Sequence, residues 1–295
     1  MSVVIKQFPV DKEYVKNPDI SSEDVRKLRE WLNTQPHLPG NYLDDVDLLI
    51  VFHCCDNSME VSKQVLDLHY TLRTHFTTFF KDRQLDQKAE FCLNTILYAP
   101  LPMPTVHGYR AIYLRLLDAD PRNFFFNDVV RTFMMVFDLW QYEEGTWPGF
   151  VLMIDMDQAV LGHLGRLEIL TIKQILYFLQ ECMLVRLKEV HFLSAPPFMD
   201  KLMLLLKPFM KKTLLDIIHI HQIGSDSIYE FVPKNSFPKE EGGDYKDHNT
   251  IRDELIKRLQ NNRQFIIEEN RRRVNENLRV NGNKANVQDL FGIQG

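Results

Sequence analysis

The chain has little of what marks several common classes of protein. Its 295 residues include four cysteines, of which two are adjacent, so we expect no disulfide framework and a reducing compartment, the cytoplasm. Acidic residues outnumber basic ones by 40 to 35, and the formal net charge is −5. Because nucleic-acid-binding proteins usually carry a basic surface, nucleic acid is not expected as the main partner.

Long hydrophobic segments are also missing. The amino terminus, MSVVIKQFPVDKEYVK, has lysines and an acid where a signal peptide needs an uninterrupted apolar run. No segment reaches the roughly 20 apolar residues that cross a bilayer. With 45% hydrophobic and 25% charged residues, the composition is that of a globular protein, which we expect to be monomeric.

The usual motifs of α/β enzymes are not found either. Gly162 and Gly165 in LGHLGRL lack the third glycine of a dinucleotide-binding turn. There is no G-x-S-x-G motif, and Ser194 is followed by two prolines rather than by a helix of small residues. His163 and Glu168 are isolated candidates for catalysis, so an enzyme is the least favoured interpretation and no cofactor is expected.

Two pairs of polar residues allow both a functional and a structural interpretation. His219 and His221 would lie on one face of a strand and could begin a metal site, but no third ligand has a telling spacing. Asp155 and Asp157 follow a strand, where catalytic acids often lie. We favour the structural interpretation for both pairs: histidines bonded to backbone or solvent, and aspartates that cap a segment and pair with a nearby base.

The order of apolar patterns predicts an α/β protein in three parts. Helical patterns at 21–35, 44–54 and 58–80 predict a small bundle within a domain at 1–90. Predicted strands then alternate with long helices, which indicates a mainly parallel sheet covered by helices within a domain at 91–248. The strands are expected at 110–117, 149–155, 189–193 and 214–221, and the helices at 127–142 and 167–187. A charged helix and tail are expected at 249–295.

One segment, VHFLSAPPFMDKLMLLLKPFM, contains a short helix that is apolar on almost every side. A surface helix normally keeps a polar face, and Pro208 ends this one well short of membrane-spanning length. Such a helix is either fully buried or has apolar surroundings on both faces, and the second case suggests a lid between an apolar cavity and a membrane. The residues expected to form its apolar face are Phe198, Leu202, Leu205, Leu206 and Phe209.

Large apolar side chains exceed what one stripe per helix would need. A large solid core is the simpler interpretation for any one of them, but together with the lid they predict a hollow core that holds a hydrophobic molecule. The walls are expected to be the helix that carries Phe133, the strand that carries Phe150 and the helix that carries Ile175. The predicted lining is Phe133, Phe137, Trp140, Phe150, Leu152, Ile154, Ile172, Ile175, Leu176, Leu179 and Phe192.

Several of these segments resemble the CRAL-TRIO lipid-binding family. The similar pieces are RLKEVHFLSAPPFMDKLMLLLKPFM, IIHIHQ, VPKNSFPKEEGG and GFVLMIDMDQ, and the region 47–80 resembles the family's amino-terminal helices. The final FGIQG resembles the end of insect members similar to α-tocopherol transfer proteins. The resemblance implies an enclosed apolar pocket over a sheet, closed by a mobile helix that corresponds to 198–210.

The resemblance also implies a function. It suggests an intracellular carrier that binds one small lipid, such as a tocopherol, retinoid or carotenoid, and exchanges it with membranes when the lid opens. Arg186 and Lys188 match basic positions of the family that contact anionic lipid, and Lys211 lies close to further ones. Two alternatives remain open: a phospholipid or phosphoinositide transfer protein, and a lipid-sensing adaptor that binds a protein partner through the charged segment 252–273.

Overall fold

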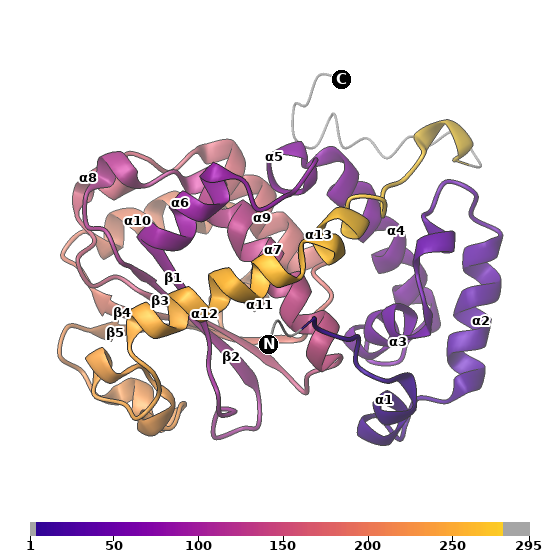
Figure 1. Ribbon diagram of the computed structural model, residues 1–295, viewed down its shortest axis with the longest axis horizontal. Helices are drawn as coiled ribbons and strands as arrows, with labels where there is room; N and C mark the ends of the chain where they lie inside the picture. Colours follow the sequence, from indigo (N-terminus) through magenta and orange to yellow (C-terminus); the bar gives the residue numbers. More distant parts are fainter. Residues whose placement is uncertain (1–3, 280–295) are drawn as a thin grey trace.

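The computed structural model describes residues 4–279 and consists of a small helical bundle beside a larger unit built on one sheet (Figure 1). The described strands are β1 Ile96–Pro100, β2 Arg110–Leu116, β3 Phe150–Asp155, β4 Leu187–Ala195 and β5 Ile218–Gln222. The α-helices are α1 Val10–Lys16, α2 Ser22–Asn33, α3 Asp45–Cys54, α4 Met59–His75, α5 Thr77–Phe80, α6 Gln87–Thr95, α7 Phe126–Glu144, α8 Leu161–Leu164, α9 Ile169–Glu181, α10 Met199–Leu206, α11 Lys212–Leu215, α12 His248–Asn261 and α13 Arg263–Glu269. Within the described residues, no helix is long and apolar enough to cross a membrane.

The amino-terminal bundle is built from helices whose starts are fixed by side-chain caps. Ser21 and Asp44 each form a capping box with the third residue of α2 and α3. The predicted single helix at 58–80 is divided, because Phe76 leaves the helical conformation with ψ 67° and its ring is fully buried. The Phe76 ring packs edge to face on the ring of Phe79, which is also fully buried.

The sheet confirms the predicted α/β class. Its order is β1-β2-β3-β4-β5; β1 pairs antiparallel with β2, and the other pairs are parallel. The sequence analysis missed β1, which has five residues directly after α6 and before a proline-rich loop. A run that short carries too little periodicity to separate a strand from the end of a helix.

Two predicted elements near the lid have different bounds in the structure. The helix expected at 167–187 ends at Glu181, where Cys182 adopts φ −155°, and β4 begins at Leu187. The strand expected at 214–221 is in fact the short helix α11 followed by β5. In both cases apolar residues continue across a change of backbone conformation, so hydrophobicity alone gave no boundary.

The sheet has two differently covered faces. Leu152 and Phe192 lie on the face that α7, α9 and α10 cover. Val151, Met153 and Leu193 lie on the opposite face, against α12 and the turns that precede it. In Figure 1, α12 crosses in front of the strands, so the sheet is enclosed on both sides. This alternation along each strand fixes which side chains can reach a site on either face.

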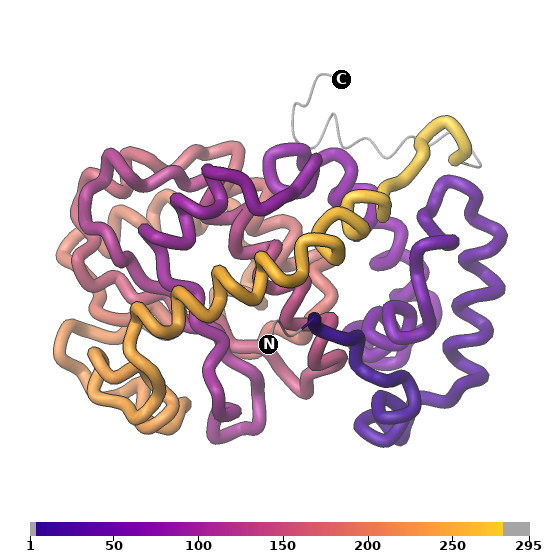
Figure 2. The backbone as a smooth tube through the Cα atoms, in the orientation of Figure 1, coloured from indigo at the N-terminus to yellow at the C-terminus, as the bar shows by residue number. Residues whose placement is uncertain are grey.

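The carboxyl-terminal helices are part of the folded body. In Figure 2 the chain runs through α12 and α13 diagonally from the sheet to the helical bundle. Glu269 of α13 pairs with Arg73 of α4 at 3.0 Å, and Arg73 and Arg83 both pair with Asp138 of α7. The segment predicted as a charged tail therefore joins the bundle to the sheet unit. The FGIQG motif lies outside the described residues.

Candidate functional site

An apolar cavity of about 280 Å³ lies between the sheet and the helices α7, α9 and α10. That volume is close to the lower end of the roughly 300–1,000 Å³ of small-molecule sites, so it suits one small molecule. Its wall consists of Ile96, Leu114, Arg115, Leu116, Phe124, Phe126, Val129, Val130, Phe133, Leu152, Ile154, Asp155, Met156, Ala159, His163, Leu164, Leu167, Ile172, Ile175, Leu176, Leu179, Met183, Val190, Phe192, Phe198, Leu202, Leu206, Met210, Leu214 and Ile218.

Most of the predicted wall residues line this cavity. They are Phe133, Leu152, Ile154, Ile172, Ile175, Leu176, Leu179 and Phe192. The strand residues reach it because positions two apart on a strand share a face, and the helix residues because they recur at helical spacing on α9. The side chains that the sequence analysis grouped by their apolar pattern thus line the same cavity.

Three predicted wall residues lie elsewhere, and for them the prediction is wrong. Phe137, Trp140 and Phe150 pack around Trp147 with ring centroids 4.4–5.8 Å apart. These four rings form a solid aromatic cluster in the core between α7 and the start of β3. Large aromatic rings fill space best against one another, so helical spacing on α7 does not show whether a ring meets a cavity or another ring.

The helix α10, which was predicted to be a lid, borders one side of the cavity with part of its predicted face. Phe198, Leu202 and Leu206 line the cavity, whereas Leu205 and Phe209 are not among its lining residues. The helix changes at Pro208 into a short turn, η3 Lys207–Phe209, which rotates Phe209 out of the helical repeat. The outer side of α10 carries Leu204, which is 75% exposed.

Both ends of α10 are held by identifiable groups. At its start, Ser194 has φ +51°, a left-handed conformation that turns the chain out of β4 before Pro196. Beyond its end, the Gln180 amide of α9 donates to the Phe209 carbonyl at 3.0 Å and accepts from the Lys211 N–H at 2.7 Å. The lid is therefore fixed by a backbone kink on one side and by one side chain on the other.

The sequence analysis missed a large part of the wall. Phe124 and Phe126 line the cavity with rings 6.3 Å apart, while Phe125 between them is 49% exposed. The run of three phenylalanines before the helix was the available signal, but the sequence did not show which of them would be buried. Ile96 and Leu114 were missed because β1 and the place of β2 in the sheet follow from strand pairing, not from local sequence.

Polar side chains are scarce at the cavity. Arg115 and Asp155 alternate along their strands with Leu114 and Ile154, so their side chains point to the opposite face. There Asp155 accepts hydrogen bonds from the Tyr113 hydroxyl at 2.5 Å and from Arg115 at 3.3 Å.

The two aspartates after β3 form a structural cluster, as predicted. Arg115 also bonds to Asp157 and Glu241, at 2.5 and 2.7 Å, and Asp155 accepts from the N–H of Asp157 at 3.0 Å. Asp155 therefore caps the end of β3, and both aspartates pair with a nearby base.

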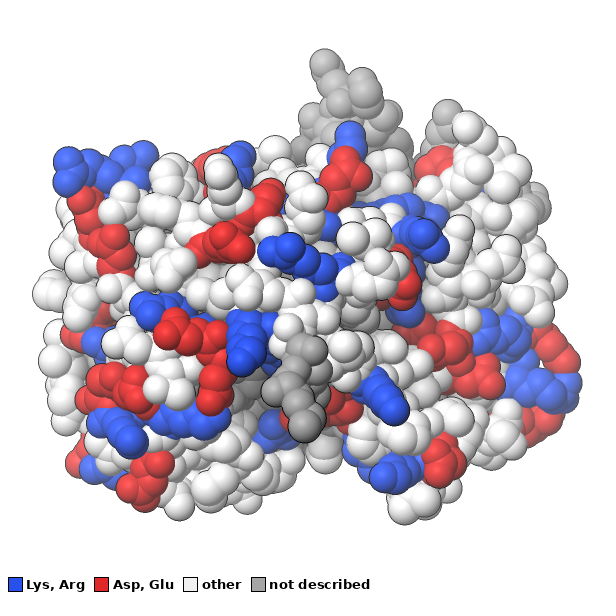
Figure 3. All heavy atoms as spheres, viewed as in Figure 1, with Lys and Arg blue, Asp and Glu red and all other residues white. Residues whose placement is uncertain are grey.

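The basic residues predicted to contact anionic lipid have carboxylate neighbours. Arg186 pairs with Asp56 at 3.0 Å, and Lys211 forms an ion pair with Glu181. Lys188 is exposed on β4. On the face drawn in Figure 3, basic and acidic groups are interleaved rather than gathered into one field of positive charge. Contact of these three residues with anionic lipid stays a prediction.

Of the predicted histidine pair, His221 belongs to a hydrogen-bonded row on the face opposite the cavity, and its partners there are side chains rather than backbone or solvent. His191 of β4 contacts Nε2 of His221 through Nδ1 at 2.9 Å, and His221 contacts the Ser227 hydroxyl at 2.7 Å. The ring of His219 stacks on that of His191, with centroids 4.8 Å apart. Burial lowers the pKa of His191 to about 3 and also lowers the pKa of His221, so both rings are neutral at pH 7.

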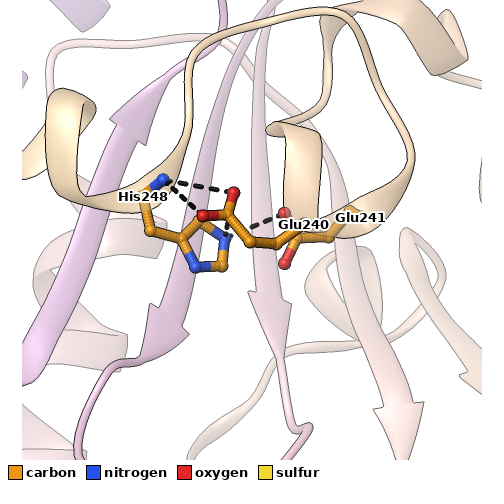
Figure 4. Close-up of side chains that lie close together, drawn as sticks. All are labelled: Glu240, Glu241 and His248. Atoms are coloured by element: carbon orange, nitrogen blue, oxygen red, sulfur yellow. Dashed lines mark hydrogen bonds and ion pairs between the residues drawn. The ribbon is translucent and has the colours of Figure 1, made fainter.

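Another group of residues has the composition of a metal site. Glu240, Glu241 and His248 have ligand atoms within 4.8 Å of one another at the start of α12 (Figure 4). Their polar atoms bond to one another: Glu240 accepts from the backbone N–H of His248 at 3.0 Å, and Glu241 contacts the His248 ring at 2.9 Å. Because Glu241 also pairs with Arg115, this group is explained as a cap of α12.

Comparison with known proteins agrees with the cavity and the sheet. Residues 97–243 match the CRAL/TRIO domain, and residues 17–89 match the "Pinta-like, UBA domain". The chain is 23% identical over 233 residues to "Alpha-tocopherol transfer protein-like" of Mus musculus, covering 79% of this chain and 68% of that protein. It is 23% identical to "Clavesin-1" of Mus musculus, covering 78% of this chain and 66% of the relative.

A chain in the crystal structure of Sfh5 aligns with a TM-score of 0.45 and 10% identity, over 78% of this chain and 91% of that chain. The family match and the curated relatives define the class of the protein: this chain belongs to the CRAL-TRIO family of lipid-binding transfer proteins.

Proposed function

We propose that the chain is an intracellular carrier that holds one small hydrophobic molecule in the cavity and exchanges it with membranes when α10 opens. The observation that carries the proposal is the apolar cavity of about 280 Å³, closed by a helix with leucines on both sides. Leu202 and Leu206 face the cavity, and Leu204 faces outward. An open lid would place these groups in the bilayer, which offsets the cost of opening because burial of each large side chain contributes about 1.5–3 kcal/mol.

The nature of the wall favours a largely apolar ligand over a phospholipid. A phosphate inside the cavity would need cationic or hydroxyl groups, and the cationic side chain among the lining residues, Arg115, is turned to the other face and paired. Tocopherol, retinoid and carotenoid types all satisfy this description, and the printed name of one relative refers to α-tocopherol. The same wall brings no nucleophile beside a base, which supports a carrier rather than an enzyme.

A lipid-sensing adaptor is the second candidate, favoured by the match of residues 17–89 to the Pinta-like UBA domain. A partner was predicted to bind the segment 252–273. In the structure Arg272 of this segment pairs with Asp47, and Glu269 pairs with the buried Arg73. A carrier transfers a lipid between vesicles without any partner. An adaptor binds the lipid but transfers none.

The test compares two leucines on opposite sides of the lid. We expect Leu206→Asp to lose the bound molecule, because it places a carboxylate in the cavity wall. Leu204→Asp should keep the molecule and slow its transfer by about tenfold or more, since it removes an apolar group from the face that meets the bilayer. Binding is measured by native mass spectrometry after incubation with phosphatidylcholine vesicles that contain retinol, and transfer by retinol fluorescence between vesicles.

Val15→Asp is the matched control, because Val15 is 80% exposed on α1 of the amino-terminal bundle. This variant should bind and transfer retinol as the unmodified chain does. Absence of any bound hydrophobic molecule, both after purification and after incubation with vesicles, would contradict the proposal. Equal transfer by the Leu204→Asp and Val15→Asp variants would contradict the role of the lid.

A further inference from the structure

One side chain of the cavity wall has an unused hydrogen-bonding atom. His163, on the one-turn helix α8, lines the cavity and is 7% exposed. Its Nε2 atom is buried and has no hydrogen-bond partner, and it is the one such atom among the lining residues that the structure describes. A buried polar group without a partner costs about 1–3 kcal/mol, so the site is incomplete as it stands.

The other ring nitrogen shows where the proton lies. Nδ1 of His163 accepts a hydrogen bond from the backbone N–H of Val160 at 3.1 Å. Nδ1 also lies 3.3 Å from the Val160 carbonyl, but that carbonyl already accepts from the backbone N–H of His163 at 2.9 Å, whereas a proton on Nδ1 would meet the Val160 N–H head on. A nitrogen that accepts carries no proton, and burial lowers the pKa of His163, which keeps the ring neutral. In a neutral imidazole with an unprotonated Nδ1, the proton is on Nε2. The unused atom is therefore a hydrogen-bond donor.

The surroundings of His163 are otherwise apolar. Its ring meets Phe124 edge to face, with centroids 5.4 Å apart, and Met156, Ala159 and Leu164 line the cavity nearby in the chain. Arg115 and Asp155 bond to groups on the other face of the sheet, so neither competes for a ligand atom. One donor in a carbon wall can satisfy one acceptor on a ligand, and it offers nothing to a second polar group.

We infer that Nε2–H of His163 binds a single oxygen acceptor on the hydrophobic ligand, such as a hydroxyl, carbonyl or ether oxygen, and so selects oxygenated lipids over hydrocarbons. This inference rests on the proposed carrier function and narrows its ligand class. The rest of the ligand is apolar and fills the space between α7, α9 and α10. His163 is thus a residue that determines specificity and has no part in a reaction.

The test offers the full-length chain three lipids with one carbon skeleton. Phosphatidylcholine vesicles contain equal amounts of phytol, the corresponding aldehyde phytal, and the hydrocarbon phytene, and the protein-bound lipids are quantified by mass spectrometry. We expect the alcohol and the aldehyde each to be retained over the hydrocarbon by about tenfold, the effect of satisfying one buried donor. The aldehyde shows whether His163 donates to the ligand or accepts from it. Its oxygen can accept a hydrogen bond but cannot donate one, so a preference for the aldehyde requires a donor on the protein.

Variants of His163 assign the preference to this side chain. His163→Leu should bind the three lipids about equally, and His163→Gln, which restores an N–H donor, should recover part of the preference. If the unmodified chain binds all three equally, or prefers only the alcohol, the inference is wrong while the carrier function stands. If His163→Leu folds and keeps the full preference, the inference is also wrong. Uptake of retinol but of none of the three lipids would also contradict the inference, whereas uptake of no hydrophobic molecule at all would contradict the proposed function itself.

Discussion

At the scale of single residues, burial keeps one histidine of the amino-terminal bundle, His69, in its neutral form. His69 of α4 lies in the interior, where its Nδ1–H donates to the carbonyl of Cys182 at 2.7 Å and its ring is 5.4 Å from that of Phe178. Burial lowers the pKa of His69 to about 3, and the charge of Arg73 adds to this effect. The contact joins the amino-terminal bundle to the end of α9.

A pH-dependent stability follows from that histidine. The unfolded chain binds a proton at His69 below its ordinary pKa of about 6.5, while the folded chain does not until about pH 3. Stability should therefore fall as the pH falls through this window, by about 1.4 kcal/mol per pH unit for this group. His69→Gln keeps a donor for the Cys182 carbonyl, so its free energy of unfolding by urea should fall less steeply between about pH 5.5 and 4. Parallel pH profiles of the two proteins would contradict this assignment.

At the scale of elements, the path from β4 into α10 depends on one residue in an unfavourable conformation. The pairing of β4 with β5 shifts register between Phe192 and Ala195, and Ser194 between them has φ +51°. A left-handed conformation costs a residue with a Cβ atom roughly 1–2 kcal/mol, and most for β-branched side chains. This bulge aims the chain from the sheet toward the lid.

Substitutions at Ser194 test this reading of the kink. Ser194→Val should lower the free energy of unfolding by about 1–2 kcal/mol, because a β-branched side chain tolerates the left-handed region poorly. Ser194→Gly is the matched variant and should be neutral within about 1 kcal/mol, since glycine adopts this conformation freely but loses more entropy on folding. The measurement is the urea midpoint at an unchanged m-value. Equal stability of the two variants would show that the conformation is not under strain.

At the scale of the whole molecule, a buried network of charges joins its parts. Arg73 of α4, Arg83 before α6, Asp138 of α7 and Glu269 of α13 are linked by ion pairs of 2.6 to 3.8 Å. Burial alone would raise the pKa of Asp138, but the two arginines hold it well below its usual range. Loss of one partner leaves a buried charge uncompensated, so the network couples the bundle, the sheet unit and the carboxyl-terminal helices.

Neighbouring glutamates on α13 provide the comparison for this coupling. Glu269→Gln removes a charge from the buried network and should lower the free energy of unfolding by about 3–5 kcal/mol. Glu268→Gln changes an exposed residue next to it and should change stability by less than about 0.5 kcal/mol. Chemical denaturation of both variants gives the difference. A loss of less than 1 kcal/mol for Glu269→Gln would contradict a coupling role for the network.

The sequence by itself determined the fold class, the parallel strands β3 and β4, and the greater part of the cavity wall. Apolar side chains at a spacing of two on Leu152 and Ile154, and at helical spacing on Ile172 and Ile175, must face the same side of their elements whatever surrounds them. The apolar helix at 198–206 could likewise be expected to border the cavity, because a helix without a polar face needs apolar surroundings. Its role as a lid stays a prediction.

The tertiary structure alone decided which large side chains surround a cavity and which surround one another. Phe133 and Phe137 are one turn apart on α7, yet only Phe133 lines the cavity, because Trp147, in the loop between α7 and β3, fills the space beside Phe137. It also decided that Leu206 faces inward and Leu204 outward, and that Nε2 of His163 has no partner. Local pattern fixes the face of an element on which a side chain lies, whereas packing between distant segments fixes what that face meets.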